Sequence, residues 1–191
     1  MLTSRRKWRR AGFTVEGKGA ASDIMVASHP SARGYLFKRY NADISAEEQL
    51  KNYRCRIKGA QKLQELITSE RLTRIVVPGK YLYEVSPTSC NGDEPCYVLV
   101  VERLALALLD SSRSKHLYRH IDVETLREFC VVLREFSGLG SGARNVPFTN
   151  REQIAFVDTE RWNEKKEDPL RRVSKYLSRE SEELAKKFLQ K

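Results

Sequence analysis

The feature of this sequence that most restricts its fold is a change of apolar periodicity near the middle of the chain. Up to about residue 104, short stretches of alternating apolar and polar residues are separated by turn-forming residues, which is typical of β-strands. One long stretch with helical spacing interrupts them, and helical spacing then dominates the remaining residues. This order predicts an α+β protein in which strands and helices are segregated.

Five stretches of the first half are predicted to form one antiparallel sheet. Residues 13–17, 23–28 and 35–40 are joined by short segments with turn-forming residues, and we expect them to form a meander. Residues 74–85 and 96–104 are two further apolar stretches rich in β-branched and aromatic residues. They are expected to complete the sheet.

The helical stretch that follows the third strand has a recognisable start. Ser45 is a good N-cap, and Glu48 three residues later completes a capping box. Gly59 is a position at which the helix is expected to bend or divide. The apolar side of this helix comprises Leu50, Tyr53, Ile57, Ala60 and Leu63.

The second half is predicted to be mostly helical. Residues 121–139 form an amphipathic helix, and residues 168–191 are expected to be helical again, with Asp168 as the cap. Between them, residues 150–162 contain a short apolar strand that runs into Asp158. The inner side of the first helix comprises Leu126, Phe129, Cys130, Leu133 and Phe136.

Composition narrows the class of protein. The chain has 191 residues, of which 40% are hydrophobic, and this suits one globular domain or one compact two-lobed unit. No apolar run approaches the roughly 20 residues that a membrane-spanning helix needs. Residues 1–10 also lack the apolar segment of a secretory signal.

The formal net charge is +10, and half of it lies in the first ten residues, as Arg5, Arg6, Lys7, Arg9 and Arg10. We expect residues 1–12 to be a basic, solvated tail that is dispensable for folding. The alternative is that this tail contacts nucleic acid, anionic lipid or an acidic protein.

The cysteines do not indicate a metal site. Cys55, Cys90, Cys96 and Cys130 include no pair at the C-x-x-C spacing of zinc sites. Cys90 and Cys96 flank a turn-rich loop and could close a small disulfide. In the absence of a secretory signal, we expect reduced thiols in a cytoplasmic protein.

Two features of the meander suit a ligand that carries phosphate. Gly17 and Gly19 let the backbone turn tightly and approach such a ligand, although a plain hairpin is the alternative. Lys38 alternates with Leu36 and Tyr40, so its ammonium is expected on an inner face, where it needs an anion. The alternative is an edge lysine whose charge reaches water.

A second set of polar residues suits a metal ion. Residues 154–157 are expected to be a buried strand that delivers Asp158, and an aspartate held in this way is a rigid ligand for Mg²⁺ beside a phosphate. Asn145 closes a glycine-rich loop upstream, and its amide oxygen could share the same ion. The alternative is that Asp158 ends the strand and caps the next turn.

In chain order, these features are a glycine-rich hairpin, a lysine on the third strand, a helix, two strands, a second helix, a loop with asparagine and a strand ending in aspartate. The order resembles that of protein kinases, and of a compact, divergent member of bacterial or effector type. The resemblance covers about residues 13–162. It implies a five-stranded N-lobe with one main helix at 13–104 and a minimal, mostly helical C-lobe at 105–191.

The resemblance implies ATP and Mg²⁺ as cofactors and gives roles to individual residues. Lys38 matches the lysine that holds the α- and β-phosphates, and Asn145 and Asp158 match the two metal ligands. These three residues are the candidate catalytic set. Asp158, Thr159 and Glu160 stand in place of the usual Asp-Phe-Gly.

The same resemblance places further residues around the nucleotide. Gly17 and Gly19 match the first two glycines of the phosphate loop, Ser22 replaces the third, and Ile24 stands for the valine that follows. The strand at 96–104 then carries Val101 at the gatekeeper position and Glu102 to Leu104 at the adenine-binding hinge.

The sequence departs from the kinase pattern at the catalytic base. Gly140 occupies the position of the usual aspartate, five positions before Asn145, and the His-Arg-Asp and Ala-Pro-Glu motifs are absent. Only 33 residues (191 − 158) follow Asp158, too few for the large helical subdomain that docks peptides. The acid that pairs with Lys38 is left open among Glu47, Glu48 and Glu65.

Two classes of function therefore follow from the resemblance. One is an atypical kinase of Ser/Thr type that transfers the γ-phosphoryl group of ATP to a protein hydroxyl, weakly or not at all without the aspartate. The other is a pseudokinase that acts as a nucleotide-binding interaction module with a protein partner. A basic nucleic-acid-binding protein is a third, weaker alternative. The compartment is expected to be the cytoplasm, or a host cytosol if the protein is a delivered effector.

Overall fold

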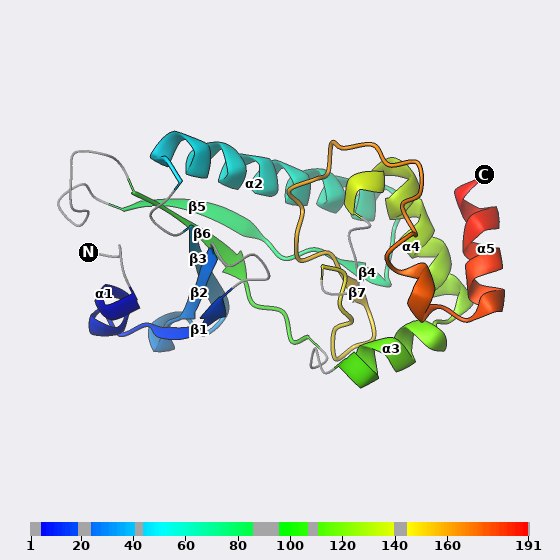
Figure 1. The fold of residues 1–191 in the computed structure, drawn as a ribbon, viewed down its shortest axis with the longest axis horizontal. Helices are drawn as coiled ribbons and strands as arrows, with labels where there is room; N and C mark the ends of the chain where they lie inside the picture. The colour runs from blue at the N-terminus through cyan, green and yellow to red at the C-terminus, as the bar shows by residue number, and fades with distance from the viewer. Residues whose placement is uncertain are drawn as a thin grey trace. The chain divides into compact units, whose positions relative to one another are not determined.

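The computed structural model describes residues 5–18, 24–40, 44–85, 96–106, 111–139 and 145–190 (Figure 1). Its contacts divide the chain into two compact units. Unit 1 contains Met1–Ile57 and Gly79–Arg103, and unit 2 contains Lys58–Pro78 and Leu104–Lys191. Residues 58–78 therefore belong to the second unit by their contacts. The sequence pattern had indicated that they belong to the first half.

An antiparallel sheet forms the centre of unit 1. In the described part of the chain it has five strands, and this confirms the predicted sheet. The strands in spatial order are β1 (Thr14–Lys18), β2 (Ile24–Ser28), β3 (Tyr35–Tyr40), β6 (Cys96–Glu102) and β5 (Lys80–Val85). A short 3₁₀ helix, η1 (Pro30–Ala32), joins β2 to β3.

Helix α2 (Ala46–Ser69) supplies the apolar side chains that cover one face of this sheet. The Ser45 hydroxyl accepts a hydrogen bond of 3.2 Å from the Glu48 amide, as the predicted N-cap requires. Tyr53 is buried, and its ring stacks on Tyr40 with centroids 5.3 Å apart. Figure 1 shows α2 as one continuous helix, so the expected division at Gly59 is wrong.

Residues 5–10 contribute to the core of unit 1 through Trp8 and are not a solvated tail. Residues Arg5–Arg10 form helix α1, and the Trp8 side chain is 0% exposed. Trp8 packs against the opposite face of the sheet, and its ring lies 4.6 Å from that of Phe13, measured between centroids. The expectation of a solvated tail is wrong because one buried tryptophan anchors the helix, whereas the basic side chains around it can remain exposed. The other buried residues of the cluster that contains Trp8 are Met25, Ala27, Val85 and Val98.

Unit 2 is built from helices around a short parallel strand pair, β4 (Ile75–Val76) and β7 (Ile154–Ala155). The predicted strand at 74–85 is thus two strands, β4 and β5, which belong to different sheets and are separated by Val77, Pro78 and Gly79. The helices of unit 2 are α3 (Ser111–Arg119), α4 (Val123–Glu135) and α5 (Arg179–Leu189), with the 3₁₀ helices η3 (Ser137–Leu139) and η4 (Ser174–Tyr176).

Two of these helices differ from the sequence-based expectation. The residues 168–191 are not one helix, because α5 starts only after Ser178, whose hydroxyl caps the Ser181 amide at 3.1 Å. Asp168 caps a turn instead, accepting a hydrogen bond of 3.1 Å from the Leu170 amide. Helix α3 was not foreseen, since its residues are mostly polar or charged.

Helix α4 carries the centre of the unit 2 core. The side chains predicted to face inward from it are all buried, which confirms its amphipathic pattern. Its one buried carboxylate, Glu128, accepts hydrogen bonds from the amides of Thr73 and Arg74, at 3.1 and 2.7 Å. This contact fixes the start of β4 on α4.

We predict that Trp8→Ala lowers the melting temperature by roughly 6–20 °C. Truncation of a buried tryptophan costs about 3–5 kcal/mol, and each kcal/mol shifts the melting temperature of a chain of this size by about 2–4 °C. Thermal unfolding followed by circular dichroism measures the change. Arg9→Ala, at an exposed position of the same helix, is the matched control and should have little effect. A shift of less than about 2 °C for Trp8→Ala would show that the N-terminal helix does not contribute to stability.

Candidate functional site

A β-hairpin in unit 2 brings two of the predicted site residues together. The Val157 amide donates to the Asn145 carbonyl at 3.1 Å, and the Ala155 amide donates to the Pro147 carbonyl at 2.8 Å. Asp158 follows Val157 directly, so Asn145 and Asp158 lie at the same open end of this hairpin. Main-chain hydrogen bonds therefore bring together two residues that are thirteen positions apart in the sequence.

The strand that carries Asp158 is also held from its other side. The Ile154 amide donates to the Arg74 carbonyl at 2.8 Å, and the Phe156 amide donates to the Val76 carbonyl at 2.9 Å. The side chains of Ile154 and Phe156 are fully buried. This segment is therefore buried as the sequence predicted, although the strand β7 itself comprises only Ile154–Ala155.

Asp158 is half-buried and has a local structural role. Its Oδ1 atom accepts a hydrogen bond of 3.2 Å from the Glu160 amide, which closes a turn after the strand. The structure thus shows the capping role that was the alternative interpretation of this residue. Capping through Oδ1 is compatible with metal binding, because a carboxylate has two oxygens and about four acceptor positions.

The loop that carries Asn145 is anchored by a buried tyrosine of α3. The Tyr118 hydroxyl donates a hydrogen bond to the carbonyl of Val146, and the Tyr118 side chain is fully buried. Burial raises the pKa of Tyr118 well above its ordinary value, so the hydroxyl remains a donor. Its ring packs edge-on against Phe148, with centroids 4.9 Å apart. Sequence reasoning missed this residue, because the apolar spacing around it does not indicate a helix.

The backbone after Asp158 packs directly on α2. A Cβ atom on Gly59 would lie 2.2 Å from the Thr159 carbonyl oxygen and 2.8 Å from Cδ1 of Trp162. Thr159 itself is 0% exposed. Gly59 is therefore needed for a close approach between the helix and the site backbone.

A second glycine makes the same kind of contact further along the segment. A Cβ atom on Gly138, in η3, would lie 2.0 Å from the Arg161 carbonyl oxygen. Two glycines from different elements thus admit the main chain of residues 159–164 at distances that any side chain would prevent.

Lys38 lies in unit 1 on the face that α2 residues cover. In the sheet it stands between Val26 of β2 and Leu99 of β6, which both belong to the cluster around Tyr53. The Tyr53 hydroxyl accepts from the Tyr40 amide at 3.0 Å and lies 3.4 Å from the Lys38 carbonyl oxygen. Lys38 is half-buried, so the prediction that it points to an inner face is in line with its register.

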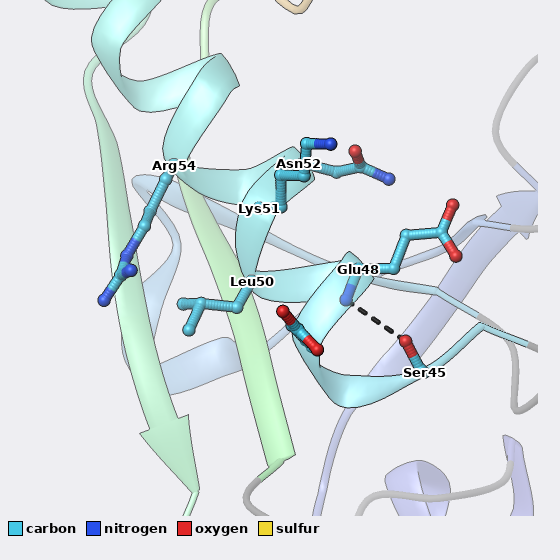
Figure 2. Close-up of a pocket in the computed structure, with 7 residues that line it drawn as sticks. Ser45, Glu48, Leu50, Lys51, Asn52 and Arg54 are labelled. Carbon is cyan, nitrogen blue, oxygen red and sulfur yellow. Dashed lines mark hydrogen bonds between the residues drawn. The ribbon is translucent and has the colours of Figure 1, made fainter.

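The candidate acids for Lys38 are placed as follows. Glu65 forms an exposed ion pair with Lys62, with Nζ and Oε2 2.6 Å apart. Glu47 and Glu48 are exposed in the first turn of α2. Figure 2 shows that this turn borders a hollow, which is lined by Ser45, Glu47, Glu48, Leu50, Lys51, Asn52 and Arg54. The hollow contains none of the residues predicted to bind nucleotide, and its mixed charges do not select a phosphate.

The strand predicted to lead to the hinge ends at Glu102, two residues before the predicted end at Leu104. Val101 is buried, and the Glu102 amide donates to the Gly79 carbonyl at 2.8 Å. The Glu102 carboxylate accepts from the Gly79 amide at 3.1 Å. The Leu104 carbonyl accepts from the Leu106 amide at 3.0 Å.

Only some of the remaining residues that were predicted to contact the nucleotide lie in the described ranges. Ile24 is buried at the start of β2, and Gly17 stands opposite Val26 in β1. Gly19, Ser22 and Gly140 lie outside the described residues. The same holds for Cys90, and hence for the suggested disulfide, whereas Cys55 is half-buried and Cys130 is buried.

The described ranges contain no group of three or more His, Cys, Asp or Glu side chains that could hold a metal ion. No helix in those ranges has the length and apolar character needed to span a membrane.

Comparisons with known proteins give similarity only at the level of solved structures. No protein-family model and no curated protein matches the chain. It is similar to the MAP kinase LmaMPK10 from Leishmania major, with 12% identity and a TM-score of 0.37, over 81% of this chain and 48% of that one. It is also similar to the bifunctional kinase-methyltransferase WbdD, with 16% identity and a TM-score of 0.39, over 84% of this chain and 35% of that one. The chain thus spans less than half the length of either.

We predict that Gly59→Ala destabilises the protein by about 1–3 kcal/mol, because the added methyl group would overlap the Thr159 carbonyl oxygen. Helix propensity alone would give the opposite sign, since alanine in a helix is favoured over glycine by about 1 kcal/mol. Urea unfolding measures the difference. Gln61→Ala, at an exposed position of α2, is the control and should be nearly neutral. A stabilised Gly59→Ala protein would contradict the close approach.

We predict that Tyr118→Phe destabilises the protein by about 1–3 kcal/mol, since the buried Val146 carbonyl would lose its donor. It should also speed hydrogen exchange at the Val157 amide, which is bonded to Asn145. Urea unfolding and exchange followed by NMR provide the two readouts. Tyr83→Phe, at a residue that is 60% exposed, is the control. Unchanged exchange at Val157 would mean that the hydroxyl does not hold the hairpin.

Proposed function

We propose that this chain is a compact, divergent protein-kinase-like protein that binds a magnesium–nucleotide complex and transfers phosphate weakly to a protein hydroxyl. The observation that carries the proposal is the hairpin that pairs Asn145 with Val157. It brings Asn145 and Asp158, which are far apart in sequence, to the same end of the hairpin. Kinases hold their metal ions with the same pair of residue types.

The chemistry of this hairpin end fits Mg²⁺. The ion prefers oxygen ligands and usually takes one or two carboxylates together with substrate phosphates. Asp158 would supply the carboxylate and Asn145 the amide oxygen. Bound Mg²⁺ would neutralise charge on the phosphates during transfer. The rigid strand behind Asp158 would hold its carboxylate without a reorganisation cost, which favours electrostatic stabilisation.

The proposal assigns the nucleotide contacts mainly to unit 1. Lys38 would hold the α- and β-phosphates, since a half-buried ammonium between Val26 and Leu99 is well suited to an anion. The hairpin with Gly17, Gly19 and Ser22 would cover the phosphates. The adenine ring would lie among Ile24, Val101, Glu102 and Leu104.

Weak transfer is expected because Gly140 replaces the catalytic aspartate. Phosphoryl transfer passes through a loose transition state that depends mainly on position and charge, so loss of the base need not abolish it. The usual contribution of general-base catalysis is about 10²–10⁴ in rate, and a loss of that size is expected here.

A pseudokinase is the second candidate, and one observation favours it. The Asp158 Oδ1 atom already caps the Glu160 amide at 3.2 Å, and Thr159 replaces the usual phenylalanine in a fully buried position. Such a site could bind nucleotide as a regulatory ligand for a protein partner without turning it over.

We predict that ATP with Mg²⁺ raises the melting temperature of the protein, since a ligand that binds only the folded state stabilises it by mass action. Asp158→Asn should remove most of the magnesium-dependent part, because the amide can still cap Glu160 but lacks the charge. Asp168→Asn is the matched control, as Asp168 makes the same kind of cap with Leu170. Absence of any shift at millimolar ATP would refute nucleotide binding.

Incubation with γ-labelled ATP and general protein substrates separates the two candidates. A kinase should label protein above background, and Asp158→Asn should abolish that label while Asp168→Asn retains it. If ATP binds but wild-type and Asp158→Asn proteins give the same background, the pseudokinase remains and the enzyme is excluded.

A further inference from the structure

The sheet of unit 1 has one face that α1 covers only in part. Trp8 belongs to one cluster of buried apolar residues with Val85, at the end of β5, and Val98 on β6. Side chains on a strand alternate between faces, so Tyr83 and Tyr81 continue the same face as Val85. They pair in register with Val98 and Val100. The buried cluster around Trp8 therefore includes Val85 but not Tyr83 or Tyr81, which are exposed.

These tyrosines are unusually exposed for aromatic residues on a sheet. Tyr81 is 56% exposed and Tyr83 is 60% exposed, and successive side chains on one face of a strand stand about 6.6 Å apart. Tyr35 of β3 lies on the same face, is 40% exposed, and approaches Tyr81 with ring centroids 6.4 Å apart. We call these three residues the tyrosine face. The three exposed rings share one face of the sheet, and those of Tyr35 and Tyr81 are inclined at 72° to each other, so each can offer a separate surface for stacking.

Helix α1 brings positive charge to the side of the sheet that carries the tyrosine face. It packs on this side through Trp8, and it presents four exposed arginines, namely Arg5, Arg6, Arg9 and Arg10. Glu102 pairs in register with Tyr35 and adds a carboxylate, which accepts from the Gly79 amide at 3.1 Å. The arginines of α1 are the groups on this side of the sheet that suit the phosphates of a ligand.

We propose that the tyrosine face and α1 together bind single-stranded nucleic acid. Single strands are bound by aromatic side chains that stack on bases and by a positive surface that follows the phosphates. The exposed rings of β3 and β5 would supply the stacking, and the arginines of α1 would contact the backbone. This site is separate from the proposed nucleotide site, whose lysine lies on the opposite face of the sheet.

The test uses the full chain and fluorescein-labelled oligonucleotides of 20 residues, oligo-U and oligo-dT, in fluorescence anisotropy. We expect both single strands to bind at low salt, and to bind more weakly as the salt concentration rises. A duplex of the same length should bind more weakly than the single strands, because its paired bases cannot stack on the rings of the tyrosine face. Equal or tighter binding of the duplex would overturn the proposal.

The stacking is tested with two double variants. Tyr81→Ala with Tyr83→Ala should weaken single-strand binding about tenfold or more, whereas Tyr81→Phe with Tyr83→Phe should retain it, since the ring remains. Both residues are exposed, so thermal unfolding should show that the variants remain folded. If the alanine pair binds like wild type, the proposal fails.

The charge is tested with a matched pair. Arg9→Ala with Arg10→Ala should weaken binding and reduce its salt dependence. Arg171→Ala with Lys187→Ala removes the same charge from exposed positions of unit 2 and should change little. Equal losses in the two pairs would mean general charge attraction only. Self-association of the chain that the tyrosine-to-alanine pair abolishes, without any effect on nucleic acid, would identify the face as an interface between copies and overturn the proposal.

Discussion

Main-chain pairing on both sides of residues 153–157 is the constraint on which the candidate site depends. One edge of this segment pairs with the residues after Asn145, and the other pairs with β4. The buried amides and carbonyls are thereby satisfied without water, which a buried strand requires. Because the strand cannot shift without breaking both sets of bonds, the start of the segment after Asp158 has a defined position, and the packing around it follows from that position.

In that packing, the main chain of the segment after Asp158 lies directly against two glycines, without side chains between them. Gly59 and Gly138 admit the main chain of residues 159–164 at distances that exclude a Cβ atom. The buried Thr159 is small, which allows α2 to lie close to the chain at this point. The site is therefore supported by rigid elements, but each support is sensitive to the addition of a single methyl group.

Unit 1 follows a different plan, with one sheet between two apolar clusters. Tyr53 and its neighbours fill one face, and Trp8 fills part of the other. The half-buried lysine lies on the first face, and the exposed tyrosines lie on the second. The two proposed binding functions thus use opposite faces of the same sheet, and each can be tested by substitutions that leave the other face unchanged.

The sequence by itself determined the local elements of the chain. Alternation and capping predicted the five strands, the start of α2 at Ser45 and the inner side of α4, because these depend on neighbours within a few residues. Only the tertiary structure determined the features that depend on contacts between distant parts of the chain. The burial of Trp8, the division of residues 74–85 between two sheets, the use of Gly59 and the anchoring by Tyr118 all depend on partners distant in sequence. The spacing of Asn145 and Asp158 suggested a shared site, but only long-range hydrogen bonds could place them at one hairpin end.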